Sequence, residues 1–181
     1  MSKELGVLRF RPLSAPDQDR VLAWRNQPDV AAQMFTDRWI TAAEHAAWFA
    51  AALTDETRRY WIIELDDVPV GLTNLYDISL PHKRASLALY LADERVRGRG
   101  VGSATDRFLM RQAFAELGLD KLSAEVLAMN ERGIAVHRRN GFAVDGVLRG
   151  HVLRAGQRID VVTMSILRTD WARGMAPVVD G

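Results

Sequence analysis

The stretch RVRGRGVGSATD, from residue 95 to residue 106, constrains the fold of this 181-residue chain more than any other segment. Its three glycines alternate with arginine and valine, between an apolar run typical of a strand and a run with helical spacing. Glycine adopts backbone conformations closed to other residues, and a strand, a glycine-rich turn and a helix N-terminus bring backbone N–H groups to one point. The stretch predicts an anion-binding turn in an α/β domain, with Arg97 and Arg99 adding positive charge.

Two familiar nucleotide-binding turns do not match this stretch. Gly98, Gly100 and Gly102 are followed by Ser103, which stands where the third glycine of the dinucleotide-binding G-x-G-x-x-G motif belongs. A phosphate-binding Walker loop is excluded, since no Gly-Lys-Ser/Thr follows. One alternative without a ligand stays open, a tight strand-to-helix turn whose arginines are solvated.

The composition narrows the class of protein. A net charge of +1 gives no support to nucleic-acid binding, and the absence of cysteine excludes disulfides and thiolate sites. The four histidines lie far apart, which argues against a zinc site, and no apolar run approaches the ~18 residues of a membrane span. We expect one cytoplasmic domain over residues 1–172 with a flexible tail over 173–181, and no metal, membrane or nucleic-acid partner.

Hydrophobic periodicity and turn residues predict the order of elements. Helices are expected from Ser14 to about Asn26, from a capping box at Thr41, after the glycine turn until Gly118, and over residues 131–139. Hairpin turns are expected at Asp66-Asp67 and Ala155-Gly156, and the tail is expected to fray after Trp171. The expected strands are 5–13, 59–65, 68–79, 85–91, 122–127, 142–153 and 158–167. This order indicates a mixed α/β domain rather than a regular βαβ repeat.

Two motifs carry a family resemblance. Arg97-x-x-Gly100-x-Gly102 resembles the pyrophosphate-binding signature of the Gcn5-related N-acetyltransferases, and NERGIAVHRRNGF, from Asn130 to Phe142, resembles the second element of that family. The two motifs together are much more specific than either alone. The resemblance implies a single-domain acetyltransferase fold, with a mixed, mostly antiparallel sheet split between two parallel strands and flanked by helices. It also implies acetyl-CoA as co-substrate.

The resemblance further implies which residues hold coenzyme A. Backbone amides of residues 99–103 would bind the pyrophosphate, and the end of the preceding strand would pair with the pantetheine arm like an added strand. A helix N-cap is an equal alternative for Asn130, and a solvated helix position is one for Arg138. The implied coenzyme-binding residues are Leu89, Leu91, Val96, Arg97, Gly98, Arg99, Gly100, Val101, Gly102, Ser103, Asn130 and Arg138.

Acetyl transfer to an amine requires a polarised thioester carbonyl and a proton for the leaving thiolate. The resemblance implies a backbone N–H near residues 89–91 as the oxyanion donor. It places His137 where the family usually has a tyrosine acid, with Tyr90 as a second candidate catalytic residue. The general base stays open, because the strand before the turn offers no carboxylate; water, His45, His82 and Asp77 are the alternatives.

Scattered identities between residues 21 and 164 narrow the resemblance. They include Arg25-Asn26-x-Pro28, Met34 and His45, and they are similar to family members that acetylate the 4-amino group of a UDP-linked amino-deoxysugar in pseudaminic acid biosynthesis. A nucleotide-sugar acceptor is therefore the expected partner, and a homodimer is possible. The expected acceptor-binding residues are Arg25, Met34, Trp39, His45, Tyr76, Asp77 and His82. Two alternatives are an acetyltransferase for protein N-termini or ribosomal proteins, and a catalytically silent acyl-CoA-binding module.

Overall fold

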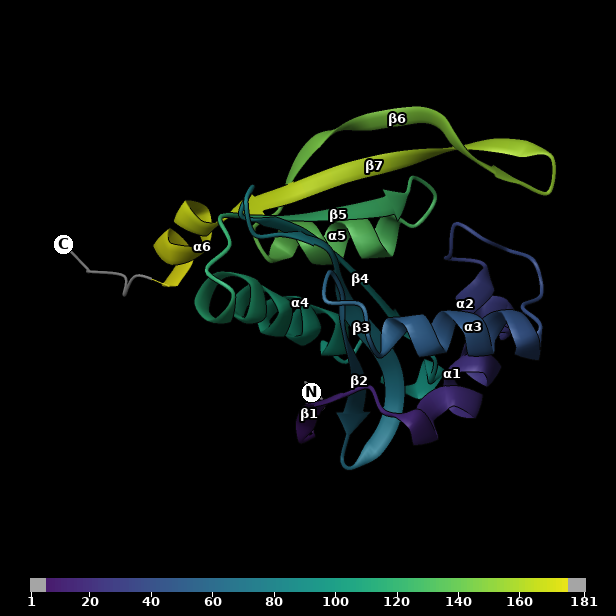
Figure 1. Ribbon diagram of the computed structural model, residues 1–181. Helices are drawn as coiled ribbons and strands as arrows, with labels where there is room; N and C mark the ends of the chain where they lie inside the picture. Colours follow the sequence, from purple (N-terminus) through teal and green to yellow (C-terminus); the bar gives the residue numbers. More distant parts are fainter. Residues whose placement is uncertain (1–5, 176–181) are drawn as a thin grey trace.

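The computed structural model describes residues 6–175, which form one seven-stranded sheet flanked by helices (Figure 1). The strand order is β1-β2-β3-β4-β5-β7-β6, and all neighbours are antiparallel except β4 and β5. This arrangement confirms the expected mixed, mostly antiparallel sheet. The strands are β1 (Leu8–Pro12), β2 (Arg59–Leu65), β3 (Val68–Ser79), β4 (Arg84–Leu91), β5 (Lys121–Leu127), β6 (Ala143–Arg154) and β7 (Gln157–Leu167).

The helices begin where the capping residues indicate. Thr41 and Glu44 form the predicted capping box, in which each side chain accepts from the other residue's backbone N–H, at 3.0 and 3.3 Å. The helices are α1 (Gln18–Arg25), α2 (Pro28–Ala31), α3 (Ala42–Ala52), α4 (Val101–Arg111), α5 (Glu131–Arg139) and α6 (Arg168–Met175). Two 3-10 turns, η1 (Ala15–Asp17) and η2 (Glu94–Val96), and a π turn, η3 (Gln112–Glu116), complete the described chain.

Alternate residues of β2 separate the two faces of the sheet. Tyr60 and Ile62 pack with Phe49 of α3 and with α1, whereas Trp61 packs with Leu109 of α4. Side chains of a strand point alternately to opposite faces, so α1 and α3 cover one face and α4 covers the other. The sheet therefore separates α1 and α3 from α4.

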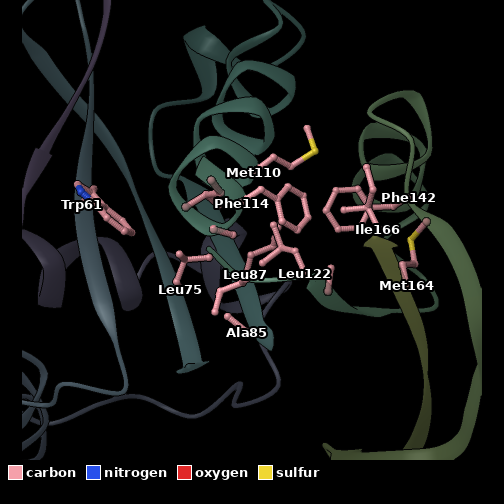
Figure 2. Packing of buried hydrophobic residues seen from close by; sticks show 14 residues of the cluster. Trp61, Leu75, Ala85, Leu87, Met110, Phe114, Leu122, Phe142, Met164 and Ile166 are labelled. Atoms are coloured by element: carbon pink, nitrogen blue, oxygen red, sulfur yellow. The ribbon is translucent and has the colours of Figure 1, made fainter. Parts of the chain in front are cut away.

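The larger core cluster lies on the α4 face and joins the two halves of the sheet (Figure 2). Leu87 of β4 and Leu122 of β5 are almost fully buried there, together with Phe114 of η3 and Met164 of β7. Burial of these apolar side chains stabilises the short region over which the parallel strands are paired.

The parallel strands β4 and β5 separate after a short region of pairing. They are in register only from Arg84–Lys121 to Leu87–Ala124, whereas β4 stays paired with β3 up to Leu91. From Ala88 onward, β4 therefore has no ladder with β5. The diverging ends open a gap in the sheet, between the strand that leads into α4 and the strand that leads into α5.

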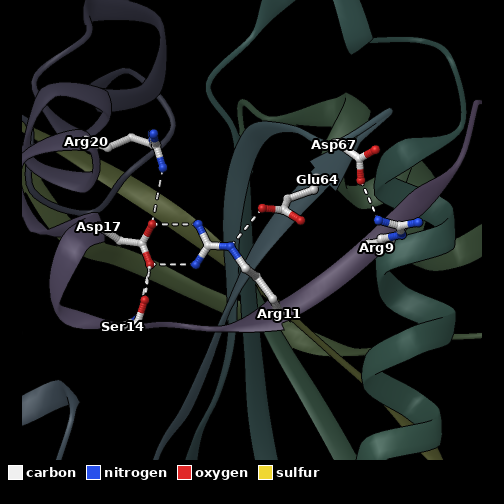
Figure 3. A network of polar contacts seen from close by, with 7 residues as sticks. All are labelled: Arg9, Arg11, Ser14, Asp17, Arg20, Glu64 and Asp67. Carbon is white, nitrogen blue, oxygen red and sulfur yellow. Dashed lines mark hydrogen bonds and ion pairs between the residues drawn. The ribbon is translucent and has the colours of Figure 1, made fainter.

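An ionic network fixes the start of α1 to the sheet (Figure 3). The Arg11 guanidinium donates to both oxygens of Asp17 at 2.7 Å and, through Nε, to Glu64 at 2.7 Å. Asp17 also accepts from the Ser14 hydroxyl and from Arg20. The Arg11 guanidinium lowers the pKa of the Asp17 carboxyl. This network orients α1, whose last residue is Arg25.

Both expected hairpin turns are confirmed, and both contain residues with positive φ. The values are 53° and 62° at Asp66-Asp67 and 46° and 77° at Ala155-Gly156, as two-residue turns between twisted strands require. The short helix α2 was not expected from the sequence. Helix α6 continues to Met175 and Trp171 packs on Phe114, whereas fraying after Trp171 stays a prediction. The expected boundary after residue 172 falls within α6, and residues 176–181 lie outside the described part.

Candidate active site

The glycine turn places three backbone amides at the start of α4. Gly98 and Gly100 have φ of 78° and 86°, in the left-handed region that favours glycine, and Gly100 is the N-cap of the helix. The N–H groups of Val101, Gly102 and Ser103 occupy the first turn, where no intrahelical acceptor exists. No atom lies within 4 Å of a Cβ built on Gly100, so the approach to these amides is open. The turn fits an anionic group such as a pyrophosphate.

Other residues of the predicted cradle have structural partners of their own. The Arg99 amide donates to the carbonyl of Val96 at 3.3 Å, and Val96 itself is buried in a cluster with Val101. The Arg97 guanidinium pairs with Asp29 of α2 at 3.1 Å. The structure thus brings residues 100–103 together as the open part of the cradle, and it uses Val96 and the Arg99 amide to shape the turn.

The predicted coenzyme residues beyond the turn line the gap between β4 and β5 or lie near it. Leu89 and Leu91 lie on the part of β4 that has left β5 and are half-buried. Asn130 follows β5 and is the N-cap of α5, where its Oδ1 accepts from the Gly133 amide at 3.0 Å. The N-cap alternative for Asn130 is therefore confirmed, and its role toward the coenzyme stays a prediction. Arg138 is exposed on α5.

His137 faces α4 rather than solvent. Its Nδ1 lies 2.8 Å from Oδ2 of Asp106, and the His137 side chain is only 8 % exposed. Asp106 is fully buried, and its Oδ2 also accepts from the Asn140 amide at 3.0 Å. A carboxylate–histidine pair thus connects the helix that follows β4 with the helix that follows β5.

A pocket of about 380 Å³ lies on the opposite face of the sheet, between α1, α3 and strands β2 to β4. It reaches Ala88, Leu89 and Tyr90, the residues of β4 directly after its pairing with β5 ends. The pocket therefore meets the gap in the sheet from the face that α1 and α3 cover. The lining residues are Arg25, Met34, Thr36, Arg38, Ile40, Glu44, His45, Trp48, Tyr60, Leu72, Asn74, Ala88, Leu89 and Tyr90.

Three polar side chains of the pocket have no hydrogen-bond or ion-pair partner among residues 6–175. Both ring nitrogens of His45 and the hydroxyl of Tyr90 are buried, and Arg25 has no carboxylate within 4.0 Å. Burial lowers the pKa of Arg25 and raises that of Tyr90. Burial, and then the charge of Arg25, lowers the pKa of His45, so the imidazole is neutral near pH 7. Unpartnered buried polar groups are rare in native proteins, so these side chains are available to a polar ligand.

The other two charged residues of the pocket neutralise each other. Arg38 pairs with Glu44 at 2.9 Å. That contact, together with hydrogen bonds from Thr41, lowers the pKa of Glu44 to about 2. The lining therefore retains one uncompensated positive charge, that of Arg25.

The remaining predicted acceptor residues lie outside this pocket. Trp39 is next to it but 71 % exposed. Tyr76 and Asp77 lie at a bulge near the end of β3, and Tyr76 is opposite Ser86 at the start of β4, at the other end of that strand from Tyr90. Burial raises the pKa of Tyr76 to about 12. His82 lies in the turn between β3 and β4. The bulge and the strand direction separate these residues from Arg25 and His45.

The sequence interpretation missed part of the lining. Trp48 packs on the core and Tyr60 belongs to strand β2, and both also contribute aromatic walls to the pocket, with ring centroids 5.5 Å apart. Asn74, a polar residue of strand β3, is a signal in the sequence that could have indicated this part of the pocket lining. Asp106 was also missed. A buried aspartate between the apolar positions of α4 gives no sign of its partner, which lies 31 residues away.

The part of the chain that the structure describes contains no group of three His, Cys, Asp or Glu residues able to hold a metal ion. Over the same residues, no helix is both long enough and apolar enough to span a membrane.

Known proteins resemble this chain over most of its length. Spermidine N(1)-acetyltransferase of Escherichia coli K12 is 27% identical over 161 residues, covering 89% of this chain and 86% of the relative. Acetyltransferase PseH of Campylobacter jejuni is 24% identical over 135 residues, covering 75% of this chain and 82% of the relative. Among solved structures, the spermidine N-acetyltransferase of Vibrio cholerae with CoA and spermine has a TM-score of 0.85 at 20% identity, over 91% of this chain and 98% of that one.

The family itself follows from a match to the acetyltransferase (GNAT) domain over residues 8–143. That range contains β1 to β5, the glycine turn, α4 and α5, and so the whole of the gap and of the pocket. The fold, the open amides at the start of α4 and the separated parallel strands agree with that match. The chain belongs to the GNAT family of N-acetyltransferases, which transfer acetyl from acetyl-CoA to amines.

Proposed function

We propose that this enzyme transfers acetyl from acetyl-CoA to the 4-amino group of a nucleotide-linked amino-deoxysugar of the pseudaminic acid type. The observation that carries the proposal is the pocket beside residues 88–90, whose lining combines an uncompensated Arg25 with the unpartnered His45 and Tyr90. A sugar nucleotide offers hydroxyls to the two neutral groups and a diphosphate to the cation. Trp48 and Tyr60 add an apolar wall for a deoxysugar ring or a base.

A polyamine is the second candidate acceptor, because spermidine acetyltransferases are among the relatives. The charge of the pocket opposes it. Two like charges about 4 Å apart repel by about 4 kcal/mol at an effective dielectric of about 20, and Arg25 has no carboxylate beside it to compensate. The single carboxylate of the lining, Glu44, is already paired with Arg38. A polycation would therefore meet net positive charge, whereas a diphosphate would be attracted.

In this proposal the amine attacks the thioester carbonyl where β4 leaves β5. A backbone N–H of residues 89–91 would stabilise the oxyanion. The attacking nitrogen then gives a proton to His45, the only one of the three candidate side-chain bases that lines the pocket. A neutral, buried imidazole is suited to accept it. Tyr90, held neutral by burial, would donate a hydrogen bond to the acceptor. The C–N bond forms, the C–S bond breaks, and the thiolate takes a proton from His137.

A thiol-release assay tests the acceptor. Acetyl-CoA is supplied with a UDP-linked 4-amino-4,6-dideoxy sugar, with spermidine, or with a basic peptide, each over a range of concentrations. We expect the highest kcat/KM for the sugar nucleotide. A higher value for spermidine or for the peptide would contradict the proposal. Binding of coenzyme A with no turnover of any acceptor would favour a catalytically silent module. Light scattering of the same sample tests the homodimer.

A further inference from the structure

Between α4 and α5, Asp106 and His137 form a buried pair that the acceptor proposal does not explain. Asp106 is fully buried, its Oδ2 lies 2.8 Å from His137 Nδ1, and its Oδ1 has no hydrogen-bond partner among the described residues. A buried carboxylate is costly unless a positive charge lies beside it. His137 is the one residue in contact with this carboxylate, among those described, that is able to become a cation.

The contact determines which nitrogen of His137 exchanges a proton. A carboxylate only accepts hydrogen bonds, so the proton in this contact belongs to Nδ1. Nε2 is then the nitrogen that gains or loses a proton. The ring stands against Phe142, with centroids 5.2 Å apart, and this packing restricts its rotation. The pair therefore fixes both the tautomer and the orientation of His137.

A chain of hydrogen bonds connects the pair to the coenzyme cradle. Asn140 donates to Asp106 Oδ2 at 3.0 Å, and its own Oδ1 accepts from the Ser103 hydroxyl at 2.7 Å. Ser103 is one of the three residues whose amides are open at the start of α4. Arg107 lies beyond it and donates to the Ser103 hydroxyl at 3.1 Å. Arg138 and Arg139, the charged neighbours on α5, are exposed.

We infer that Asp106 is the positioning residue for His137, and that the pair replaces the tyrosine acid usual in this family. Asp106 holds Nδ1–H and compensates the charge of the imidazolium in a buried setting. The Nε2–H bond breaks, its proton goes to the coenzyme thiolate as the C–S bond breaks, and neutral His137 is reprotonated from solvent. This inference rests on the proposed acetyl transfer, but not on the identity of the acceptor.

A double-mutant cycle with acetyl-CoA and the UDP-amino sugar tests the assignment. We expect D106N and H137F each to lower kcat by about tenfold or more, and the double variant to lose no more than H137F alone. Losses that multiply would overturn the assignment, because Asp106 would then act independently of His137. R139Q is the matched control, since it changes an exposed residue of α5 two positions from His137 and leaves the pair intact. We expect it to lower kcat by less than about threefold, with thermal stability recorded for every variant.

Two further readouts do not respond to a merely structural role. The decline of kcat toward alkaline pH should disappear in H137F; an unchanged pH profile would remove His137 from the mechanism. ¹⁵N NMR of neutral His137, with coenzyme A bound and no acceptor present, should show the Nδ1–H tautomer in the wild type and a mixture in D106N. An Nε2–H tautomer in the wild type would overturn the inference. Because this measurement needs no acceptor, it separates failure of the inference from failure of the proposed acceptor.

Discussion

The proposed coenzyme side and the proposed acceptor side of this enzyme are built in opposite ways. The proposed cradle uses the backbone amides of three consecutive residues, 101–103, and depends on the left-handed backbone at Gly98 and Gly100. The pocket uses side chains from α1, α3, three strands and the segment between α2 and α3, spread between residue 25 and residue 90. The cradle is therefore sensitive to backbone conformation, whereas the pocket is sensitive to the charge and protonation of single side chains.

Gly100→Val is the substitution expected to weaken coenzyme binding most. A branched residue at a φ of 86° costs about 1–3 kcal/mol in strain, and its side chain would stand in the open approach to the amides. We expect acetyl-CoA affinity to fall by about 100-fold or more, measured by isothermal titration calorimetry. Gly118→Val is the matched control, because Gly118 also has positive φ (64°) and open space at its Cβ but lies beyond η3. It should lose thermal stability and keep its affinity. If Gly100→Val kept the wild-type affinity for acetyl-CoA, the glycine turn would not be the coenzyme-binding site.

How much could be predicted from the sequence depends on whether the residues that form a feature are neighbours in the chain. The glycine turn, the capping box at Thr41 and the two hairpin turns are formed by neighbours in the chain, so residue type alone indicates them. Arg25 and His45 were expected at the acceptor and do line the pocket. Tyr76 and His82 do not, because the bulge between Tyr76 and Ser79 and the β3–β4 turn place them at the far end of β4.

Other features depend on packing between distant segments. The pairing of Asp106 with His137 requires α4 and α5 to lie side by side, which no local pattern encodes. Likewise, the lowered pKa of His45 follows from its burial and from the nearby Arg25. The sequence left water, His45, His82 and Asp77 as alternative bases; the pocket contains only His45 among the three side chains.

On the acceptor side, His45→Gln should have the largest effect. Glutamine keeps a polar group in the pocket and removes the base, so we expect kcat to fall by about 100-fold while the affinity for acetyl-CoA stays unchanged. Stopped-flow thiol release and calorimetry measure the two quantities. His82→Gln, in the β3–β4 turn, is the control and should retain wild-type kcat. Equal kcat values in His45→Gln and His82→Gln would indicate that water, and not His45, accepts the proton.

Arg25→Gln should have a smaller effect, mainly on the acceptor. We expect the KM for the UDP-amino sugar to rise by about tenfold, which corresponds to about 1.4 kcal/mol. Because Arg25 lowers the pKa of His45, its removal should raise that pKa, and the acid limb of kcat should move to higher pH. Arg38→Gln is the control, since Arg38 lines the same pocket but is paired with Glu44. A KM for spermidine that rises in parallel in Arg25→Gln would contradict an anionic acceptor.

The smallest effect on catalysis should come from Asp17→Asn, which loosens the network in Figure 3 that orients α1. The Asp17 side chain is 2 % exposed, and its loss should cost about 2 kcal/mol of unfolding free energy. Since Arg11 lowers the pKa of Asp17, this contribution is present above the carboxyl's ordinary pKa and disappears as pH falls through the lowered value. Urea unfolding across that pH range should therefore show a wild-type stability loss that the variant lacks.

The same variant also separates the two sides of the molecule. The acceptor KM should rise about two- to threefold through Arg25, whereas acetyl-CoA affinity should not change, because α1 covers only the acceptor face. Asp67→Asn is the matched control. Asp67 pairs with Arg9 in the same view, but its side chain is 73% exposed, so its loss should cost less than about 0.5 kcal/mol. If Asp17→Asn weakened coenzyme binding as much as acceptor binding, the two sides would be coupled through the sheet, and their separate construction would not make them independent.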